Sequence, residues 1–428
     1  MPRSRMVALA VAVVVVVGIG VWLSQQERPG TALASPTGAA SASAAGTPAG
    51  SGGLLAPTGY LGNGTIAFSR NDPAIDESAV YLINPDGSGE TRLRLVSPWA
   101  GGSSELDGYG CCPVFSPSGL RVAVGFNDNS GAGSEGTWRQ TQIVNLDGSP
   151  ASTVPVRCVA CESILGIDYD PRAWSPDGRL LALQVWSDAD ATRSGINVAP
   201  LDGTDWAIQI SGAGSDDIPV AFSPDGTRLL FVRLAPSERP GALWELTMPA
   251  LQADGTLLPG PLAIRQVSPS GLTVTFNDYF GQSASYSPDG SQIAFVGTDA
   301  SGSGRVYVVD ADGGEPTAIA GPGEFVTSAG WSPDGSWIVF DLSTPGGRHD
   351  LYIIRPDGTG QTNLTESFDP GICCSVWSPD GTALLGQATV TSDDQAYLFI
   401  VPIDGSTIYQ VTTTPALYEN VSWGAASR

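Results

Sequence analysis

The motif Trp174-Ser-Pro-Asp-Gly178 identifies the fold, because the chain repeats it. Near copies, each an aromatic residue followed by Ser-Pro-Asp-Gly or Ser-Pro-Ser-Gly, begin at Phe115, Phe222, Tyr286, Trp331 and Trp377. Successive aromatic residues are 59, 48, 64, 45 and 46 positions apart, and a seventh, Trp423, follows after another 46. Proline presets the first corner of a type I turn, aspartate suits the second, and glycine supplies the left-handed residue of a bulged hairpin. The repeat therefore predicts a tight turn between two strands at the same point of each unit.

Each repeated unit has room for four strands. An apolar run follows the first turn, as in Leu180–Val185, and a β-favouring run comes later, as in Arg305–Asp310. A second turn such as Asp312-Gly313 and a last short strand such as Gln361–Thr365 complete the unit. A four-stranded antiparallel meander of about 45 residues has the size of a propeller blade. Seven units predict an all-β, seven-bladed β-propeller.

The first unit needs an innermost strand from elsewhere in the chain. The 46-residue spacing favours Asn420–Gly424, so that the C-terminus closes the ring and leaves no sheet edge. An alternative is Tyr60-Leu-Gly-Asn-Gly64, which also aligns with the aromatic-plus-turn motif. We predict closure by the C-terminus, with the Tyr60 segment as the alternative.

The aromatic-Ser-Pro-Asp-Gly repeats over residues 60–424 resemble those of the TolB-like, WD40-like branch of β-propellers. The resemblance implies an extracytoplasmic propeller. TolB proteins themselves carry an α/β domain before a six-bladed propeller, and here only a tether precedes seven units, so the resemblance is to the repeats and not to TolB itself. Similar blades occur in extracytoplasmic prolyl-oligopeptidase-like enzymes. Because the chain ends soon after Trp423, we expect no added hydrolase domain.

The N-terminal segments predict export from the cytoplasm. Arg3 and Arg5 precede an uninterrupted run of 18 apolar or glycine residues, Met6–Leu23. This length is at the border between a secretory signal and a spanning helix, so residues 1–30 are predicted to be a signal-anchor or a cleaved signal peptide. Residues 31–57 carry no charge and are rich in Ala, Gly, Ser and Pro, which indicates a flexible linker. The propeller, residues 58–428, is then extracytoplasmic, tethered by a single anchor or secreted.

The charge excludes one class of partner and suggests another. The formal net charge is -23, which argues against nucleic-acid binding because phosphate contacts need a basic face. In a propeller, both tight turns of every blade lie on one face and the variable loops lie on the other. Acids assigned to those loops are candidate binding residues for an envelope protein, peptide or glycan, including a cationic one. They are Glu105, Asp107, Asp168, Asp170, Asp216, Asp217, Asp278, Asp369 and Glu419. The alternative is a solvated acidic surface that serves solubility.

Six cysteines are predicted to form disulfides, because an even number in an oxidising compartment favours them over thiols. They are Cys111, Cys112, Cys158, Cys161, Cys373 and Cys374, all assigned to blade-to-blade loops. Both adjacent pairs stand three and four residues before a motif aromatic. The sequence does not choose among the 15 pairings. A local Cys158–Cys161 bond and a cross-link from Cys111 or Cys112 to that loop are both open.

No catalytic motif emerges from the sequence. There is no Gly-x-Ser-x-Gly elbow, and His349 is the only histidine. We therefore predict no catalytic residue, metal site or cofactor, and a non-catalytic binding or scaffold module at the cell envelope. The alternative is a small extracytoplasmic hydrolase or lyase with its site at the mouth of the propeller channel.

Overall fold

The computed structural model describes most of the region predicted to be the propeller. The described residues are 63–72, 77–95, 110–128, 138–149, 152–154, 167–187, 194–201, 207–211, 216–234, 241–252, 257, 262–274, 283–323, 326–343, 348–389 and 395–426. The predicted targeting segment, the linker and residues 60–62 of the Tyr60 segment lie outside them. Within those ranges, no helix has the length and hydropathy to span a bilayer.

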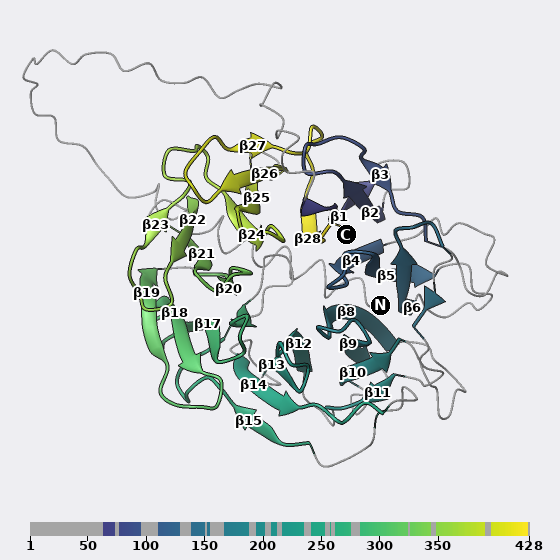
Figure 1. Cartoon of the computed structure of the whole chain (residues 1–428), viewed down its shortest axis with the longest axis horizontal. Helices are drawn as coiled ribbons and strands as arrows, with labels where there is room; N and C mark the ends of the chain where they lie inside the picture. The colour runs from purple at the N-terminus through teal and green to yellow at the C-terminus, as the bar shows by residue number, and fades with distance from the viewer. Residues whose placement is uncertain are drawn as a thin grey trace, which may run out of the picture. The chain divides into compact units, whose positions relative to one another are not determined.

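Seven four-stranded antiparallel sheets surround a common axis, and each is one blade (Figure 1). Blade 1 contains β28 (Tyr418–Trp423), β1 (Ile66–Asp72), β2 (Glu77–Ile83) and β3 (Thr91–Arg92). Blade 2 contains β4 (Gly110–Phe115), β5 (Arg121–Asp128), β6 (Trp138–Asn145) and β7 (Ser152–Thr153). Blade 3 contains β8 (Ile167–Trp174), β9 (Leu180–Ser187), β10 (Gly195–Pro200) and β11 (Ile208–Gln209).

The other four blades repeat this order of strands from the axis outward. Blade 4 contains β12 (Asp216–Phe222), β13 (Arg228–Leu234), β14 (Gly241–Thr247) and β15 (Ile264–Gln266). Blade 5 contains β16 (Ala284–Tyr286), β17 (Gln292–Thr298), β18 (Gly304–Asp310) and β19 (Thr317–Gly323). Blade 6 contains β20 (Gly330–Trp331), β21 (Ile338–Ser343), β22 (His349–Ile354) and β23 (Thr362–Asn363). Blade 7 contains β24 (Cys373–Trp377), β25 (Ala383–Thr389), β26 (Ala396–Pro402) and β27 (Tyr409–Gln410).

The C-terminal strand closes the ring, as the spacing to Trp423 predicted. β28 pairs with β1 in antiparallel register, with Ile66 opposite Trp423 and Arg70 opposite Tyr418. The seven-bladed, four-stranded prediction is confirmed, and so is C-terminal closure.

The Ser-Pro-Asp-Gly turns have the chemistry that the motif requires. At Ser223–Gly226, the Gly226 N–H donates to the Ser223 carbonyl at 2.8 Å, and Gly226 has a φ of 71°. The Ser223 hydroxyl donates to the Asp225 carboxylate at 2.5 Å. Hydrogen bonds from Ser223 and Thr227 lower the pKa of Asp225 to about 2. The turn aspartates are therefore explained by the fold, because each carboxylate holds its own hairpin.

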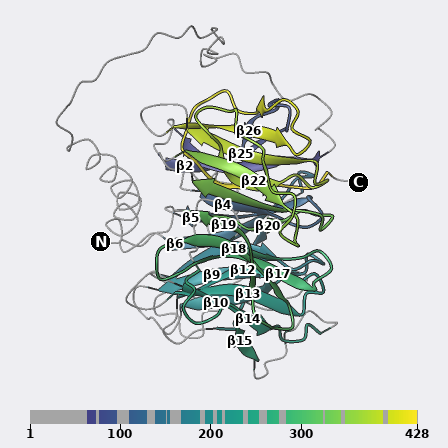
Figure 2. The same cartoon turned by 90° about the vertical axis from the view of Figure 1, so that its left-hand side faces the viewer.

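The core lies between blades. Seven clusters of buried apolar side chains are found among the described residues, one for each pair of neighbouring blades around the ring. Between blades 1 and 7, for example, the fully buried Phe68 and Tyr418 pack with Leu398. Figure 2 shows the blades edge-on as layers of strands. Since each sheet is covered on both sides by its neighbours, the innermost strands are held rigidly around the axis.

Candidate functional site: the axial cavity and its disulfides

A cavity of about 410 Å³ lies on the propeller axis. Most of its lining residues lie in, or just before, six of the seven innermost strands: β4, β8, β12, β20, β24 and β28. These strands surround the axis in Figure 1, and Val339 of β21 and Gln387 of β25 complete the wall. This volume is within the range of about 300–1,000 Å³ that small-ligand sites occupy. Of the described residues that line it, only Arg172 is charged. The wall otherwise combines apolar and aromatic groups with the hydroxyls and amides of Ser328, Ser375, Gln387 and Asn420.

One position of the repeat builds much of this wall. It stands three residues before each motif aromatic and is occupied in turn by Cys112, Pro171, Pro219, Ser283, Ser328, Cys374 and Asn420. All of these except Ser283 line the cavity. The same position in the sequence repeat is therefore the same position around the axis, and it carries four kinds of side chain: cysteine, proline and serine twice each, and asparagine once.

Three of these residues have an unusual backbone. Cys112, Cys374 and Asn420 have φ values of 58°, 69° and 51°, and they are the described non-glycine residues with positive φ. Each lies at a register shift between the first and second strands of its blade. Bulges and left-handed residues of this kind concentrate at sites where a protein must aim a side chain. They belong to blades 2, 7 and 1, which are neighbours in the ring.

Adjacent cysteines form two disulfides at this cavity. Cys111 is bonded to Cys112 in β4, and Cys373 is bonded to Cys374 in β24. The structure places these four cysteines in innermost strands, which corrects the sequence-based assignment to loops. The strands start earlier than expected because β5 and β25 pair with them as far as Gly110 and Cys373. Cys158 and Cys161 lie outside the described residues.

A buried carboxylate anchors the second disulfide. Asp341, in β21 of the preceding blade, is fully buried and accepts the Cys374 N–H at 2.7 Å. The hydroxyls of Ser375 and Thr327 also donate to it, each at 3.3 Å. Burial raises the pKa of Asp341 to about 6, although these hydrogen bonds oppose the shift. No sequence pattern singled out this residue, because it lies inside an apolar strand and two of its partners, Cys374 and Ser375, come from the next blade.

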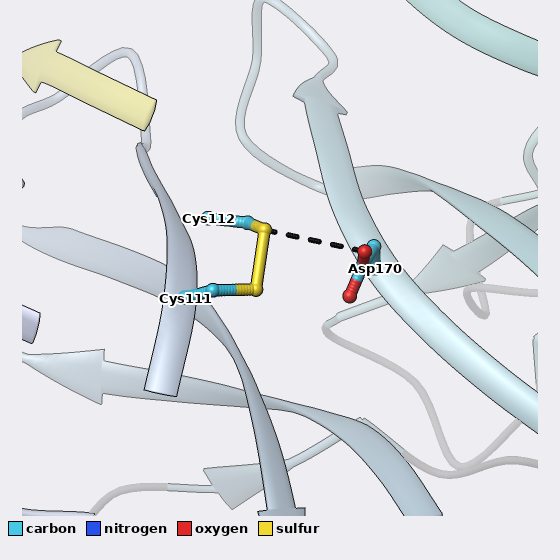
Figure 3. A group of neighbouring side chains, drawn as sticks. All are labelled: Cys111, Cys112 and Asp170. Carbon is cyan, nitrogen blue, oxygen red and sulfur yellow. Dashed lines mark hydrogen bonds between the residues drawn. A yellow bond between two sulfur atoms is a disulfide. The ribbon is translucent and has the colours of Figure 1, made fainter. Parts of the chain in front are cut away.

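A second buried carboxylate lies beside the first disulfide. Asp170, in β8 of the following blade, has 2% of its surface exposed, and its Oδ2 is 4.0 Å from the Cys112 Sγ (Figure 3). Its Oδ2 is also 4.0 Å from Nη2 of Arg172. Arg172 in turn donates through Nε and Nη2 to the Gln184 side-chain oxygen at 3.0 and 2.5 Å. The one charged residue on the cavity wall is thus held in place by β9.

The structure describes six of the nine acids proposed as binding residues. Asp168 and Asp170 lie in β8, Asp216 and Asp217 in β12, and Glu419 in β28, so five of them are in innermost strands and not in loops. Their backbones pair with the second strands, for instance Asp168 with Trp186. Glu105, Asp107 and Asp278 lie outside the described residues.

These acids have different environments. Asp217 is fully buried and paired with Arg233, its two oxygens 2.7 and 2.8 Å from Nε and Nη2. Asp216 and Asp369 are exposed, and Asp168 and Glu419 are half-buried. Asp168, Asp216 and Glu419 lie near the N-terminal ends of their strands, which is the end opposite the Ser-Pro-Asp-Gly turns. No member of the nine is among the described residues that line the cavity.

His349 has no catalytic surroundings in the described structure. It starts β22 opposite Ser343, and burial lowers the pKa of its imidazole, while Asp350 opposes that shift. Asp350 itself accepts from Arg348 at 2.9 Å and from Asn363 at 3.1 Å. The histidine is not part of the cavity wall.

Comparisons with known proteins support the fold. No family model matches the sequence, and no curated protein matches it. The propeller domain of the Trilobed protease from Pyrococcus furiosus is similar in structure, with a TM-score of 0.51, 12% identity, and 81% of this chain and 92% of that chain covered. A puromycin hydrolase mutant in complex with PGG gives a TM-score of 0.55 at 16% identity, covering 86% and 54% of the two chains.

TolB from Acinetobacter baumannii is also similar, with a TM-score of 0.44, 17% identity, and 71% of this chain and 64% of that chain covered. The chain has a β-propeller fold. It spans less than two thirds of TolB and about half of the puromycin hydrolase. At these identities the likenesses concern the fold alone.

Proposed function

We propose that this protein is an extracytoplasmic binding module, tethered by its N-terminal segment, that holds part of an envelope protein, peptide or glycan partner in the axial cavity. One observation carries the proposal: the three left-handed non-glycine residues, Cys112, Cys374 and Asn420, all lie on the wall of this single cavity. Left-handed residues held at one cavity by a rigid ring of blades are the arrangement expected of a binding site on a scaffold.

The charges suggest how a partner approaches. Asp168, Asp216 and Glu419 lie at the loop end of the innermost strands, and the cavity beyond them is uncharged apart from Arg172. A cationic partner would be attracted by the acidic end and would then place a neutral or anionic group in the cavity. Such attraction weakens as salt rises, because exposed charges are screened beyond about 8 Å at physiological ionic strength.

The test is site-specific photo-crosslinking in cells that make the full chain. A crosslinking residue at Val376, on the cavity wall, should trap a partner, and one at Asp404, in an exposed turn, should not. Filling the cavity through Val421→Trp should remove the adduct at position 376. Capture of the same partner from both positions, or an adduct unaffected by Val421→Trp, would reject the axial site.

A hydrolase or lyase function is the second candidate, because a puromycin hydrolase shares the fold over 86% of this chain. The purified protein should be screened against ester, peptide and glycoside substrates. Turnover that Val421→Trp abolishes would assign the cavity to catalysis.

A further inference from the structure

Three metal-binding groups from two blades converge beside the axial cavity (Figure 3). The sulfurs of Cys111 and Cys112 and a carboxylate oxygen of Asp170 all lie within 4.8 Å of one another. The three residues are buried, with exposures of 0%, 7% and 2%. Cys112 nevertheless lines the cavity, so the cluster has a route to solvent along the axis.

Glycine at position 125 keeps this cluster open. Gly125 pairs with Cys111, and a Cβ placed on it would be 2.9 Å from the Asp170 Oδ1 and 3.4 Å from the Cys111 Sγ. The equivalent position in the other blades, three residues beyond the strand partner of the motif aromatic, always carries a side chain. Those residues are Ser69, Gln184, Val232, Val296, Asp341 and Gln387. Blade 2 alone has no side chain where the sulfurs and the carboxylate meet.

The carboxylate is poorly matched to a closed disulfide. A disulfide sulfur carries no hydrogen, so the 4.0 Å contact between Cys112 and Asp170 is not a hydrogen bond while the bond is intact. Two thiols could donate to the carboxylate, and two thiolates could share a cation with it. We infer that Cys111, Cys112 and Asp170 form a redox-dependent site for a thiophilic divalent cation such as Zn²⁺, closed when the disulfide is formed and available when it is reduced.

The site would form in two steps, reduction of the disulfide and binding of the cation. A dithiol reductant transfers two electrons and two protons to the Cys111–Cys112 bond and becomes a disulfide itself. The cation then displaces the two thiol protons and binds both thiolates and the Asp170 carboxylate, with water from the cavity as a fourth ligand. Zn–S bonds of about 2.3 Å and Zn–O bonds of about 2.1 Å hold tetrahedral ligand atoms roughly 3.5–4 Å apart. Atoms that already lie within 4.8 Å of one another need only small shifts.

The second vicinal pair is a matched control inside the same chain. Cys373–Cys374 has the same position in the repeat, but the nearby carboxylate of Asp341 accepts the Cys374 N–H and the Ser375 hydroxyl. Position 387, opposite Cys373, is a glutamine where blade 2 has Gly125. Among the described residues, only the Cys111 pair forms a three-ligand cluster.

The test uses the full chain with Cys158 and Cys161 replaced by serine, so that reduction opens only the two vicinal pairs. The protein is reduced with a dithiol, freed of it under argon and titrated with Cd²⁺, followed by the ultraviolet thiolate-to-cadmium band. We expect one tightly bound Cd²⁺ per reduced chain and none per oxidised chain. Cys111→Ser with Cys112→Ser should abolish binding, and Cys373→Ser with Cys374→Ser should leave it unchanged.

Asp170→Asn gives the most direct check, because it preserves shape and removes the charged ligand. It should weaken Cd²⁺ binding at least about tenfold, the lower end of what even indirect support of a metal ligand is worth. Asp341→Asn should leave binding within about twofold of the parent. Unchanged affinity in Asp170→Asn, or binding that follows the Cys373 pair, would overturn the assignment. It does not depend on the proposed partner, since the probe is the ion alone.

Discussion

Two vicinal disulfides occupy the same repeat position in blades 2 and 7 and have different neighbours. In both, the second cysteine has a left-handed backbone conformation and lies on the cavity wall. Asp341, from the blade before, binds the backbone of Cys374, whereas Asp170, from the blade after, faces the sulfur of Cys112. In blade 7, Asp341 therefore fixes the bulge at Cys374. In blade 2, Asp170 lies beside the cysteine sulfurs as a potential metal ligand. The difference shows that the packing partners of a repeated motif, and not the motif itself, determine its chemistry.

Removing the strand between the two disulfides should destabilise the fold most strongly. β28 separates β24 from β4 and carries Asn420 at the same position. Deleting residues 418–428 exposes the edge of β1 and removes the buried side chains of Tyr418 and Trp423. Burial of each aromatic side chain is worth about 1.5–3 kcal/mol, so we expect the free energy of unfolding, measured by urea denaturation, to fall by about 3–6 kcal/mol. An unchanged midpoint would mean that another segment completes blade 1.

Replacing the two buried carboxylates, Asp341 and Asp170, by asparagine should change the free energy of unfolding by different amounts. Asp341→Asn leaves donors of Cys374, Ser375 and Thr327 poorly matched in a fully buried site, which should cost about 2–3 kcal/mol of unfolding free energy. Asp170→Asn removes the 4.0 Å ion pair with Arg172 and should cost about 1 kcal/mol. Urea denaturation of the oxidised proteins measures both. Equal losses would remove the distinction between an anchoring and a ligand carboxylate.

Asp341 should also make the stability of the folded protein depend on pH. Burial raises its folded-state pKa to about 6, above the value of about 3.9 for an unfolded aspartate. Between these values the folded protein binds more protons than the unfolded chain, so this group stabilises the fold as pH falls from about 6 to about 4. Compared with Asp341→Asn, the parent should therefore gain stability over that interval. Parallel pH profiles for the two proteins would contradict the assignment.

The sequence predicted the seven blades and their closure, because turns such as Ser223–Gly226 are local and need no knowledge of packing. It placed Cys111, Cys373 and Asp168 in loops, since cysteine pairs, prolines such as Pro171 and acids do not resemble a strand. Those segments are strands because neighbouring strands and blades enclose them on both sides. The vicinal bonds and the role of Asp341 depend on contacts between blades, which no local pattern encodes. The one available signal was that both cysteine pairs precede an aromatic by the same spacing.

Gly125 in blade 2 and Gly386 in blade 7 lie close to the two cysteine pairs. A Cβ on Gly386 in blade 7 would be 2.5 Å from the Ile372 Cγ2 and 3.1 Å from the Cys373 carbonyl oxygen, so Gly386→Ala should cost about 1–3 kcal/mol. Gly125→Ala in blade 2 meets a side-chain oxygen at 2.9 Å and should cost about 1 kcal/mol. Of the two variants, only Gly125→Ala should reduce Cd²⁺ binding in the reduced protein. Loss of binding in Gly386→Ala with Gly125→Ala unaffected would reverse the assignment of the two blades.

Two substitutions of Asn420 test whether the disulfides or the bulges impose the left-handed backbone, and we expect their effects on stability to be small. Asn420 has a φ of 51° with no disulfide beside it, at the position equivalent to Cys112 and Cys374. If the bulge imposes this conformation, Asn420→Gly should be within about 0.5 kcal/mol of the parent, because glycine adopts it without steric cost. Asn420→Ala should lose about 1 kcal/mol, since a left-handed alanine costs about 1–2 kcal/mol and asparagine tolerates the region better. Differential scanning calorimetry of both variants resolves the order. Equal stability of the two would show that β28 relaxes when Asn420 is replaced, and the left-handed residues of blades 2 and 7 would then owe their backbone to their disulfides.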